Sequence, residues 1–263
     1  MQQTDSDVDW RIVKRKTTEF DKTFCSKHSW SAFRQCKPKM KNYRAIAAGV
    51  LPIAKDQRGH IYVLLGRECV GRSVTQSGLW CDFGGGISPY DCSIYGASRE
   101  FVEETLGCVL GHVSISKTVS YVLQNRLATI QSMFGNAKPY DMHLVRFAYD
   151  VDICDLFSSR YDACLQDSVQ KSLDSAPKSP HPTRTLTPIF LPARAFHKNG
   201  QIKQSFKEKD QIQWFRLRDI ESSIFDTDQI GLRPEFAQTL RHHWNTLQSC
   251  LKCMDPIHLP RQN

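Results

Sequence analysis

The chain of 263 residues lacks any apolar run long enough to cross a bilayer as a helix, and this excludes a membrane-spanning protein. Its opening segment, MQQTDSDVDWRIVKRK, is polar and lacks the apolar stretch of a secretory signal. The two absences together predict an intracellular protein, cytoplasmic or nuclear, that does not act at a membrane. No internal repeat is evident either, so a repeat architecture is not expected.

Cysteine is plentiful, but its spacing lacks the pattern of a disulfide framework. The ten cysteines are scattered along the chain, and without a secretion signal we interpret them as reduced thiols. One CxxC pair, Cys250 and Cys253, has no second pair. His242 and His243 lie one or two helical turns upstream, so a zinc site is conceivable, but an incidental pair in a terminal helix is the interpretation that we favour.

The net charge of +8 is concentrated near the N-terminus. Residues 11–44 hold eleven lysines and arginines with aromatic residues between them. Basic residues with aromatics can follow a phosphate backbone and stack on bases, so one interpretation is RNA binding through this extension. The interpretation that we favour is an arm that packs its aromatics on the domain. Polyanionic substrates alone would also account for a basic surface.

The most informative segment is residues 85–107, GGISPYDCSIYGASREFVEETLG. At about 100° of rotation per helical residue, Glu100, Glu103 and Glu104 fall within one narrow stripe, beside an apolar stripe that packs down. Like charges so close repel one another, so we expect a cation against them. Hard carboxylate oxygens suit Mg²⁺ or Mn²⁺. The alternative interpretation is a solvated charged helix face.

This segment resembles the Nudix box, G-x5-E-x7-R-E-U-x-E-E-x-G-U, in which U is a bulky aliphatic residue. The matching residues are Gly85, Arg99, Glu100, Glu103 and Glu104. The chain departs from the pattern in three places: Asp91 stands for a glutamate, Phe101 is aromatic, and Leu106 intervenes before Gly107. The extra residue lies past the glutamate stripe and should change only the C-cap, where Gly107 can still adopt a positive φ.

The resemblance implies a metal-dependent hydrolase that cuts a pyrophosphate bond in a nucleoside diphosphate linked to another moiety. Mg²⁺ or Mn²⁺ is the implied cofactor, and a nucleotide-type small molecule is the implied partner. The implied metal ligands are Glu100, Glu103 and Glu104, and the catalytic candidates are Glu103, Glu104, Arg99 and Glu208. Gly85 and Gly86 are candidate substrate-binding residues. Arg67 and Arg72, which follow the second predicted strand, are candidates for contacts with substrate phosphates, and a role in solubility alone is their alternative. Arg99 is expected to hold a neighbouring glutamate in place. Glu208 is the candidate general base, with Asp210 second, and an ordinary exposed loop is the alternative for both.

Two other functions stay open. One is hydrolysis at RNA 5′ ends, as in a cap pyrophosphohydrolase, which the basic extension and the long insertion favour. The other is a non-catalytic nucleotide-binding module, for which Asp91 and the slip at Leu106 give the only support. The sequence does not fix the substrate or the oligomeric state.

The predicted fold is α/β: a Nudix-type α/β/α sandwich with a mixed sheet. The predicted parts are a basic N-terminal extension over 1–42, a domain over 43–252 with a mobile insertion at about 165–190, and a C-terminal tail over 253–263. Strands are predicted over 45–53, 60–67, 80–86, 117–124, 142–151 and 213–217; helices over 91–105, 152–167 and from Pro234; and turns at 56–59 and at Asn199-Gly200.

Overall fold

The structure is a computed structural model. It describes residues 45–70, 77–134, 138–174, 191–198, 201–252 and 254. Several predictions lie outside the described residues: the N-terminal extension, Arg72, the Asn199-Gly200 turn, Cys253 and most of the insertion and tail.

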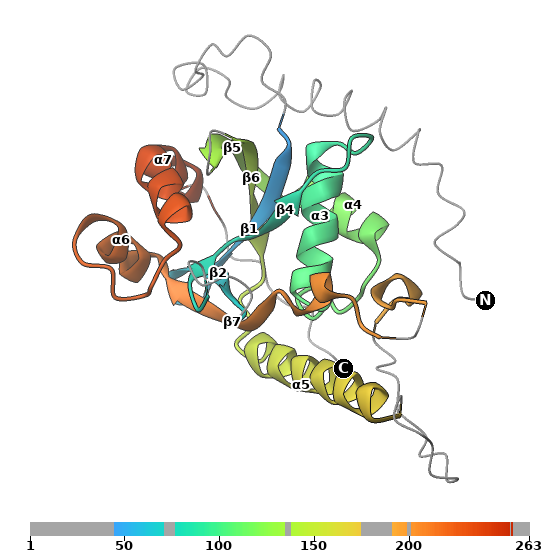
Figure 1. Ribbon diagram of the computed structural model, residues 1–263. Coiled ribbons are helices and arrows are strands. Elements are labelled where there is room, and N and C mark those ends of the chain that lie inside the picture. The colour runs from blue at the N-terminus through green and yellow to red at the C-terminus, as the bar shows by residue number, and fades with distance from the viewer. Residues whose placement is uncertain are drawn as a thin grey trace.

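A seven-stranded mixed sheet forms the centre of the molecule (Figure 1). Its middle strand is β1 (Ala47–Lys55), which pairs in parallel with β6 (Lys138–Phe147) along its whole length. β6 pairs in turn with the antiparallel edge strand β5 (Arg126–Phe134). β1 is a nearly continuous apolar run because both of its faces are covered.

The other edge of β1 is shared by two strands, and this produces a fork in the sheet. β2 (Ile61–Glu68) pairs only with the end of β1, while β4 (Phe83–Gly86) pairs with its beginning. Beyond the fork, β2 pairs with β3 (Trp80–Cys81) on one side and with β7 (Lys209–Arg216) on the other. Side chains near the fork therefore come from strands that are distant in sequence.

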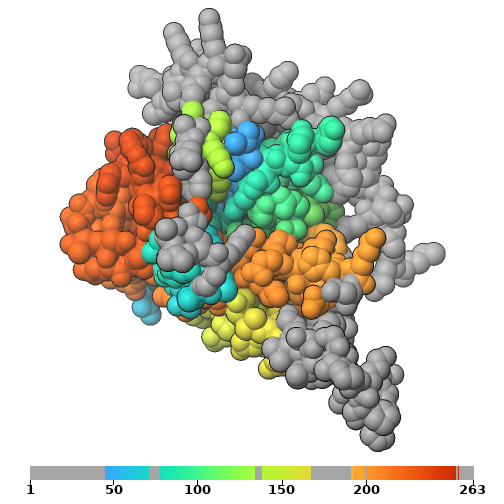
Figure 2. All heavy atoms as spheres, in the orientation of Figure 1, coloured from blue at the N-terminus to red at the C-terminus, as the bar shows by residue number. Residues whose placement is uncertain are grey.

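Helices cover both faces of the sheet and complete three layers. The first face carries α3 (Ser93–Glu104), α4 (Ile115–Asn125) and α5 (Ile153–Asp174). The second carries α6 (Leu217–Phe225) and α7 (Pro234–Lys252). In the space-filling view, the C-terminal helices and the α3 side flank the strands (Figure 2). Two short 3₁₀ helices, η3 (Ala193–Ala195) and η4 (Gln204–Lys207), precede β7.

The alternation of side chains along β1 divides the interior into two cores. Ala48 and Val50 face the α3 side, while Leu51 and Ile53 face α7. The predicted α/β/α sandwich with a mixed sheet is therefore confirmed. None of the described helices combines the length and the hydropathy needed to cross a membrane.

The prediction of a strand over 117–124 was wrong, because this stretch lies within α4. The prediction rested on β-branched and aromatic content, but Ile115, Val119 and Val122 are buried at helical spacing. Ser114 caps the helix by accepting a hydrogen bond from the Lys117 backbone N–H. Packing against α3 therefore overrides the strand propensity.

Most other element predictions are confirmed within a few residues, including β1, β2, α3, β6, β7, α7 and the turn at Asp56–Gly59. The predicted strand over 80–86 is two strands that separate at Asp82. The predicted helix over 152–167 continues to Asp174, so the first part of the predicted insertion is helical. β5 and α6 were not predicted at all.

Candidate functional site

The helix α3 is seated on the sheet by one apolar face and ends in an unusual C-cap. Ile94, Ala97 and Phe101 are almost completely buried. After Glu104, both Leu106 and Gly107 adopt positive φ angles of 52° and 65°. The Gly107 N–H donates to the Val102 carbonyl at 3.1 Å. The extra residue in the box is therefore absorbed by two consecutive left-handed residues, and the turns that carry the glutamates stay regular.

The glycine strand β4 lies directly against the glutamate face of α3. A Cβ atom at Gly85 would lie 2.6 Å from the Glu100 carboxyl group. Only glycine permits this close approach. Gly86 differs, since a Cβ there would meet nothing within 4 Å. The carbonyl of Gly86 accepts a hydrogen bond from Arg99 at 2.8 Å, which ties the strand to the helix.

Arg99 bridges two of the three glutamates. Its Nη2 donates to Glu100 Oε1 at 2.7 Å, and its Nη1 donates to Glu103 Oε2 at 3.3 Å. Burial lowers the pKa of Arg99, but the charges of Glu100 and Glu103 outweigh burial and raise it above its ordinary value. Asp91 also contributes to this rise, so it lies close enough for its charge to act on Arg99.

A cavity of about 480 Å³ opens at the fork between β1 and β2. Its acidic lining comes from Glu68, Asp82, Glu104 and Glu208, and its basic lining from Lys138 and Arg233. Gly85 and Gly86 also line the cavity, whereas Glu100, Glu103 and Arg99 do not. The cavity therefore meets the glutamate stripe at Glu104 and places acids from four separate segments together.

Glu104 is the most buried of the three glutamates. Its side chain is buried, and its Oε2 has no hydrogen-bond partner among the described residues. Burial raises the pKa of Glu104 well above its ordinary value, the ammonium of Lys209 opposes the shift, and the charges of Glu68, Glu100 and Glu208 add to it. A buried carboxylate oxygen without a partner is costly, so it marks a place that suits a cation.

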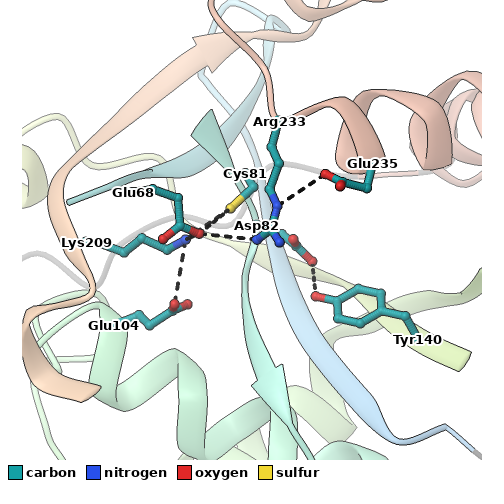
Figure 3. A network of polar contacts seen from close by, with 8 residues as sticks. All are labelled: Glu68, Cys81, Asp82, Glu104, Tyr140, Lys209, Arg233 and Glu235. Atoms are coloured by element: carbon teal, nitrogen blue, oxygen red, sulfur yellow. Dashed lines mark hydrogen bonds and ion pairs between the residues drawn. The ribbon is translucent and has the colours of Figure 1, made fainter. Parts of the chain in front are cut away.

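Glu104 lies at one end of a network of polar contacts, which it joins through Lys209 (Figure 3). The Lys209 ammonium lies 2.8 Å from Glu68 Oε1 and 3.6 Å from Glu104 Oε1. Arg233, which precedes α7, lies 3.4 Å from both Glu68 Oε1 and Glu235 Oε2. Part of the positive charge that the sequence predicts beside the glutamates therefore comes from the chain itself, through Lys209.

Asp82 and Tyr140 form a second buried pair at the fork. The Tyr140 hydroxyl donates to Asp82 Oδ2 at 2.6 Å. Burial raises the pKa of Asp82 to about 6, although the Tyr140 hydrogen bond and the Lys209 charge oppose the shift. The pair lies where β3 and β4 separate, so it fixes the floor of the cavity.

The predicted residues near β7 divide into two groups. Glu208 lines the cavity, and its charge contributes to the raised pKa values of both Glu100 and Glu104. Asp210 instead accepts a hydrogen bond from Arg67 Nε at 2.8 Å. Neither Arg67 nor Asp210 lines the cavity.

The donor chemistry at the site fits Mg²⁺ or Mn²⁺, but the donors are not preassembled. Within the described ranges, no three Asp, Glu, His or Cys side chains converge as a metal cage. Arg99 holds Glu100 and Glu103, and Lys209 faces one oxygen of Glu104. The partnerless Oε2 of Glu104 is the observation that favours a metal, since hard carboxylate oxygens are the ligands that these ions prefer.

Reasoning from sequence missed several residues of the site, namely Glu68, Asp82, Lys138, Tyr140, Lys209 and Arg233. Lys209 lies in the charged run that supplied Glu208 and Asp210, and such a run normally indicates a solvated loop. The only signal was position, because Lys209 lies shortly before the strand predicted over 213–217. Its burial depends on pairing with Glu68, which lies 141 positions earlier in the chain.

No protein-family profile matches the chain, and no curated protein matches it in sequence. Similar solved structures include a Nudix hydrolase from M. smegmatis, RenU, with 12% identity and a TM-score of 0.40 over 80% of this chain and 90% of that one. A MutT protein from Methanosarcina mazei has 14% identity and a TM-score of 0.37 over 79% and 99%. An Ap4A hydrolase from C. elegans has 13% identity and a TM-score of 0.35 over 77% and 98%. Likenesses this distant carry no conclusion about the activity of this chain.

Proposed function

We propose that this chain is a divalent-metal-dependent hydrolase of the Nudix type, which cleaves a pyrophosphate bond in a nucleoside diphosphate linked to another moiety. The observation that carries the proposal is the placement of Glu104. It ends a stripe of three glutamates on α3, it faces the cavity at the fork, and its Oε2 has no partner among the described residues.

The residues of α3 would hold the metal, with Glu100, Glu103 and Glu104 as the ligands. When bound, Mg²⁺ or Mn²⁺ neutralises charge on phosphoryl oxygens and lowers the pKa of water. Arg99 fixes the rotamers of Glu100 and Glu103 through its two hydrogen bonds. These two carboxylates would therefore have to reorient before they converge with Glu104 on one ion. Gly85 and Gly86 line the same cavity as Glu104, and Gly85 leaves room for the Glu100 carboxyl group behind it.

The substrate phosphates would meet positive charge inside the cavity. Lys138 and Arg233 line it from two separate segments, and Arg233 lies 3.4 Å from Glu68 Oε1. Phosphoryl transfer requires mainly positioning and electrostatic stabilisation, which such a mixed lining supplies. Arg67 and Arg72 stay predictions as substrate contacts: Arg67 is bonded to Asp210, and Arg72 lies outside the described residues.

Glu208 is the favoured general base because it lines the same cavity as Glu104. Its rival Asp210 already accepts hydrogen bonds from Arg67 and from the Val70 backbone N–H. A base must reach the proton that it removes, and a carboxylate engaged outside the cavity does not.

A non-catalytic nucleotide-binding module is the second candidate, and one observation favours it. Lys209 occupies the side of Glu104 that faces Glu68, so part of the carboxylate charge is already neutralised. Such a module would bind nucleotides in the same cavity and release them unchanged.

The test is a turnover screen with Mg²⁺ or Mn²⁺, run on the full chain and on Glu104→Gln. The panel holds ADP-ribose, NADH, a dinucleoside tetraphosphate, a sugar nucleotide and a capped RNA. We expect one substrate to be cleaved and Glu104→Gln to lose at least about 100-fold in kcat/KM, since the stripe loses a charged ligand but no core contact. Cleavage of the capped RNA alone would assign the activity to RNA 5′ ends.

Glu221→Gln is the matched control for that screen. Glu221 lies on α6 in the opposite layer and accepts a hydrogen bond from Trp244 Nε1 at 2.9 Å, which a glutamine oxygen can also accept. We expect its turnover to equal that of the wild type. Binding of a panel nucleotide without turnover, unchanged by Glu104→Gln, would instead establish the non-catalytic module.

A further inference from the structure

Lys209 is a fully buried lysine whose ammonium points into the carboxylates of the site (Figure 3). It begins β7 and lies opposite Glu68 of β2 in the strand register. Its Nζ lies 2.8 Å from Glu68 Oε1, 3.6 Å from Glu104 Oε1 and 3.0 Å from Cys81 Sγ. Lysine is almost never fully buried unless it is paired, so this pairing is what keeps the side chain inside.

The negative charge that faces Lys209 is carboxylate charge. Burial raises the pKa of the Cys81 thiol to about 12, so the sulfur is a neutral neighbour. Arg233 lies on the far side of Glu68, at 3.4 Å from the same Oε1. Glu68 thus meets two cations, whereas Glu104 meets Lys209 through one oxygen and has its other oxygen without a partner among the described residues.

The aliphatic stem of Lys209 has little freedom to leave this position. A Cβ atom at Gly66 would lie 3.0 Å from both Cγ and Cδ of Lys209 and 2.8 Å from the Phe83 ring. The absence of a side chain at Gly66 is therefore what makes room for the lysine stem beside the core. Because the backbone of Lys209 is part of a strand, moving the ammonium out would require repacking around Gly66 and Phe83.

We propose that Lys209 is a resident cation of this site: its ammonium holds the place between Glu68 and Glu104 that a divalent ion would otherwise take. The wild-type chain therefore binds one divalent ion fewer than its carboxylates would accommodate. The inference rests on the proposed function only in treating the α3 glutamates as metal ligands.

Two physical facts lead to this assignment. Glu68 and Glu104 would repel each other strongly in a buried place without a cation between them. Two carboxylates that converge from a strand and a helix also offer the oxygen donors that Mg²⁺ and Mn²⁺ bind. A fixed ammonium there repels a second cation, so an added ion is directed to the open Oε2 side of Glu104.

The test counts bound Mn²⁺ by electron paramagnetic resonance in the full chain and in Lys209→Met, which has a stem of similar length without the charge. We expect Lys209→Met to bind one more Mn²⁺ per chain than the wild type. We also expect a lower melting temperature for this variant without metal and its recovery when Mn²⁺ is added. An equal number of ions with equal affinity in both proteins would overturn the proposal.

Lys203→Met is the matched control, because it removes a lysine charge from the same segment at a residue that does not line the cavity. We expect it to bind the wild-type number of Mn²⁺ ions. A gain of one ion in this variant as well would show that general charge, rather than the place of Lys209, decides the number, and the proposal would fail.

A second measurement uses the wild type alone and holds even where Lys209→Met does not fold. Lysines are acylated under native conditions with and without Mn²⁺ and located by mass spectrometry. A resident ammonium leaves Lys209 unmodified in both states. Modification of Lys209 when Mn²⁺ is added would show that the metal displaces the side chain, which contradicts the proposal.

The outcomes separate this inference from the proposed function. A wild type that binds no Mn²⁺ and cleaves nothing, beside a Lys209→Met variant that gains one ion, would refute the hydrolase and support the resident cation. Turnover by the wild type with no gain of an ion in Lys209→Met would support the hydrolase and refute the resident cation.

Discussion

At the scale of single residues, His143 shows how a buried polar group ties α3 to the sheet. Its Nε2 lies 2.9 Å from the Ser93 hydroxyl at the start of α3, and its Nδ1 lies 3.0 Å from the Thr129 hydroxyl on β5. Burial lowers the pKa of His143 to about 3, and the charge of Arg126 adds to the shift. The imidazole is therefore neutral in the folded protein at any pH near neutrality.

This depressed pKa predicts a loss of stability in acid. Between the unfolded pKa of about 6.5 and the folded value, only the unfolded chain binds the proton, so the free energy of unfolding falls as the pH falls. We expect the titration of His143 to lower the free energy of unfolding by about 2 kcal/mol at pH 5 relative to pH 7. Urea unfolding of the wild type and of His143→Gln at several pH values measures the difference.

The same experiment has a clear contrary outcome. Asp82, with a raised pKa, acts in the opposite direction as the pH changes, and it does so equally in both proteins. The difference curve therefore isolates His143. Parallel curves for the two proteins between pH 5 and pH 7 would show that His143 does not titrate as a buried neutral group.

The contacts of Arg99 and the site around Lys209 differ in how far the sequence could predict them. Arg99 reaches Glu103 because residues at i and i+4 of one helix are neighbours, which the sequence spacing alone predicts. Its contact with the adjacent Glu100 is not predicted by that spacing. Lys209 reaches Glu68 only because β7 pairs with β2 in one register. A one-residue slip of that register would turn Lys209 to the other face, so its burial is a property of the assembled sheet.

At the scale of elements, the exit of α3 is the place where the chain departs most from the box that it resembles. Gly107 has a φ of 65°, and a Cβ atom there would lie 2.6 Å from the His112 carbonyl oxygen. The departure is local because the helix has already delivered Glu104 to the cavity before the turn begins.

Replacing Gly107 by alanine should destabilise the fold by about 1–3 kcal/mol, since both the left-handed backbone and the contact with His112 oppose a side chain. Gly111→Ala is the control: Gly111 has a φ of 67°, but a Cβ there meets nothing within 4 Å. We expect Gly111→Ala to cost only about 1–2 kcal/mol, the backbone part of the penalty. Equal losses in urea unfolding of the two variants would show that the contact with His112 is relieved by a small shift.

The elements that were predicted correctly carry strong local signals, and those that were missed do not. β1 is a long apolar run, and α7 opens at Pro234 with apolar residues at helical spacing. α4 contains residues of high strand propensity, yet it packs on α3 as a helix. Short-range propensity is weak beside the gain from burying Val119 and Val122 in the core.

At the scale of the whole molecule, the described residues that line the cavity and form both cores come after the basic N-terminal extension, which itself lies outside the described part of the chain. Removal of residues 1–42 therefore tests what that extension contributes. For a substrate that is a small nucleotide, we expect kcat/KM to stay within about twofold of the full chain at low and at high salt.

An RNA-acting enzyme would behave differently in the same assay. Its kcat/KM on capped RNA would fall on truncation, and the steep dependence on salt would be lost together with the lysines and arginines that contact phosphates. A truncated chain that loses activity on every substrate, with a lower melting temperature, would assign the extension to the fold instead.

The fork between β1 and β2 affects which parts of this sequence can diverge in evolution without loss of the fold. The cavity lies where one edge of β1 changes partner, because β2 pairs with the end of β1 and β4 pairs with its beginning. The pairing of the other edge of β1 with β6 is continuous. Cys69 and Ser77, which lie between β2 and β3, line the cavity at that fork. Changes at these two positions would alter the cavity lining without disturbing the pairing of β1 with β6, so the cavity can change its ligand preference while the sheet is inherited intact.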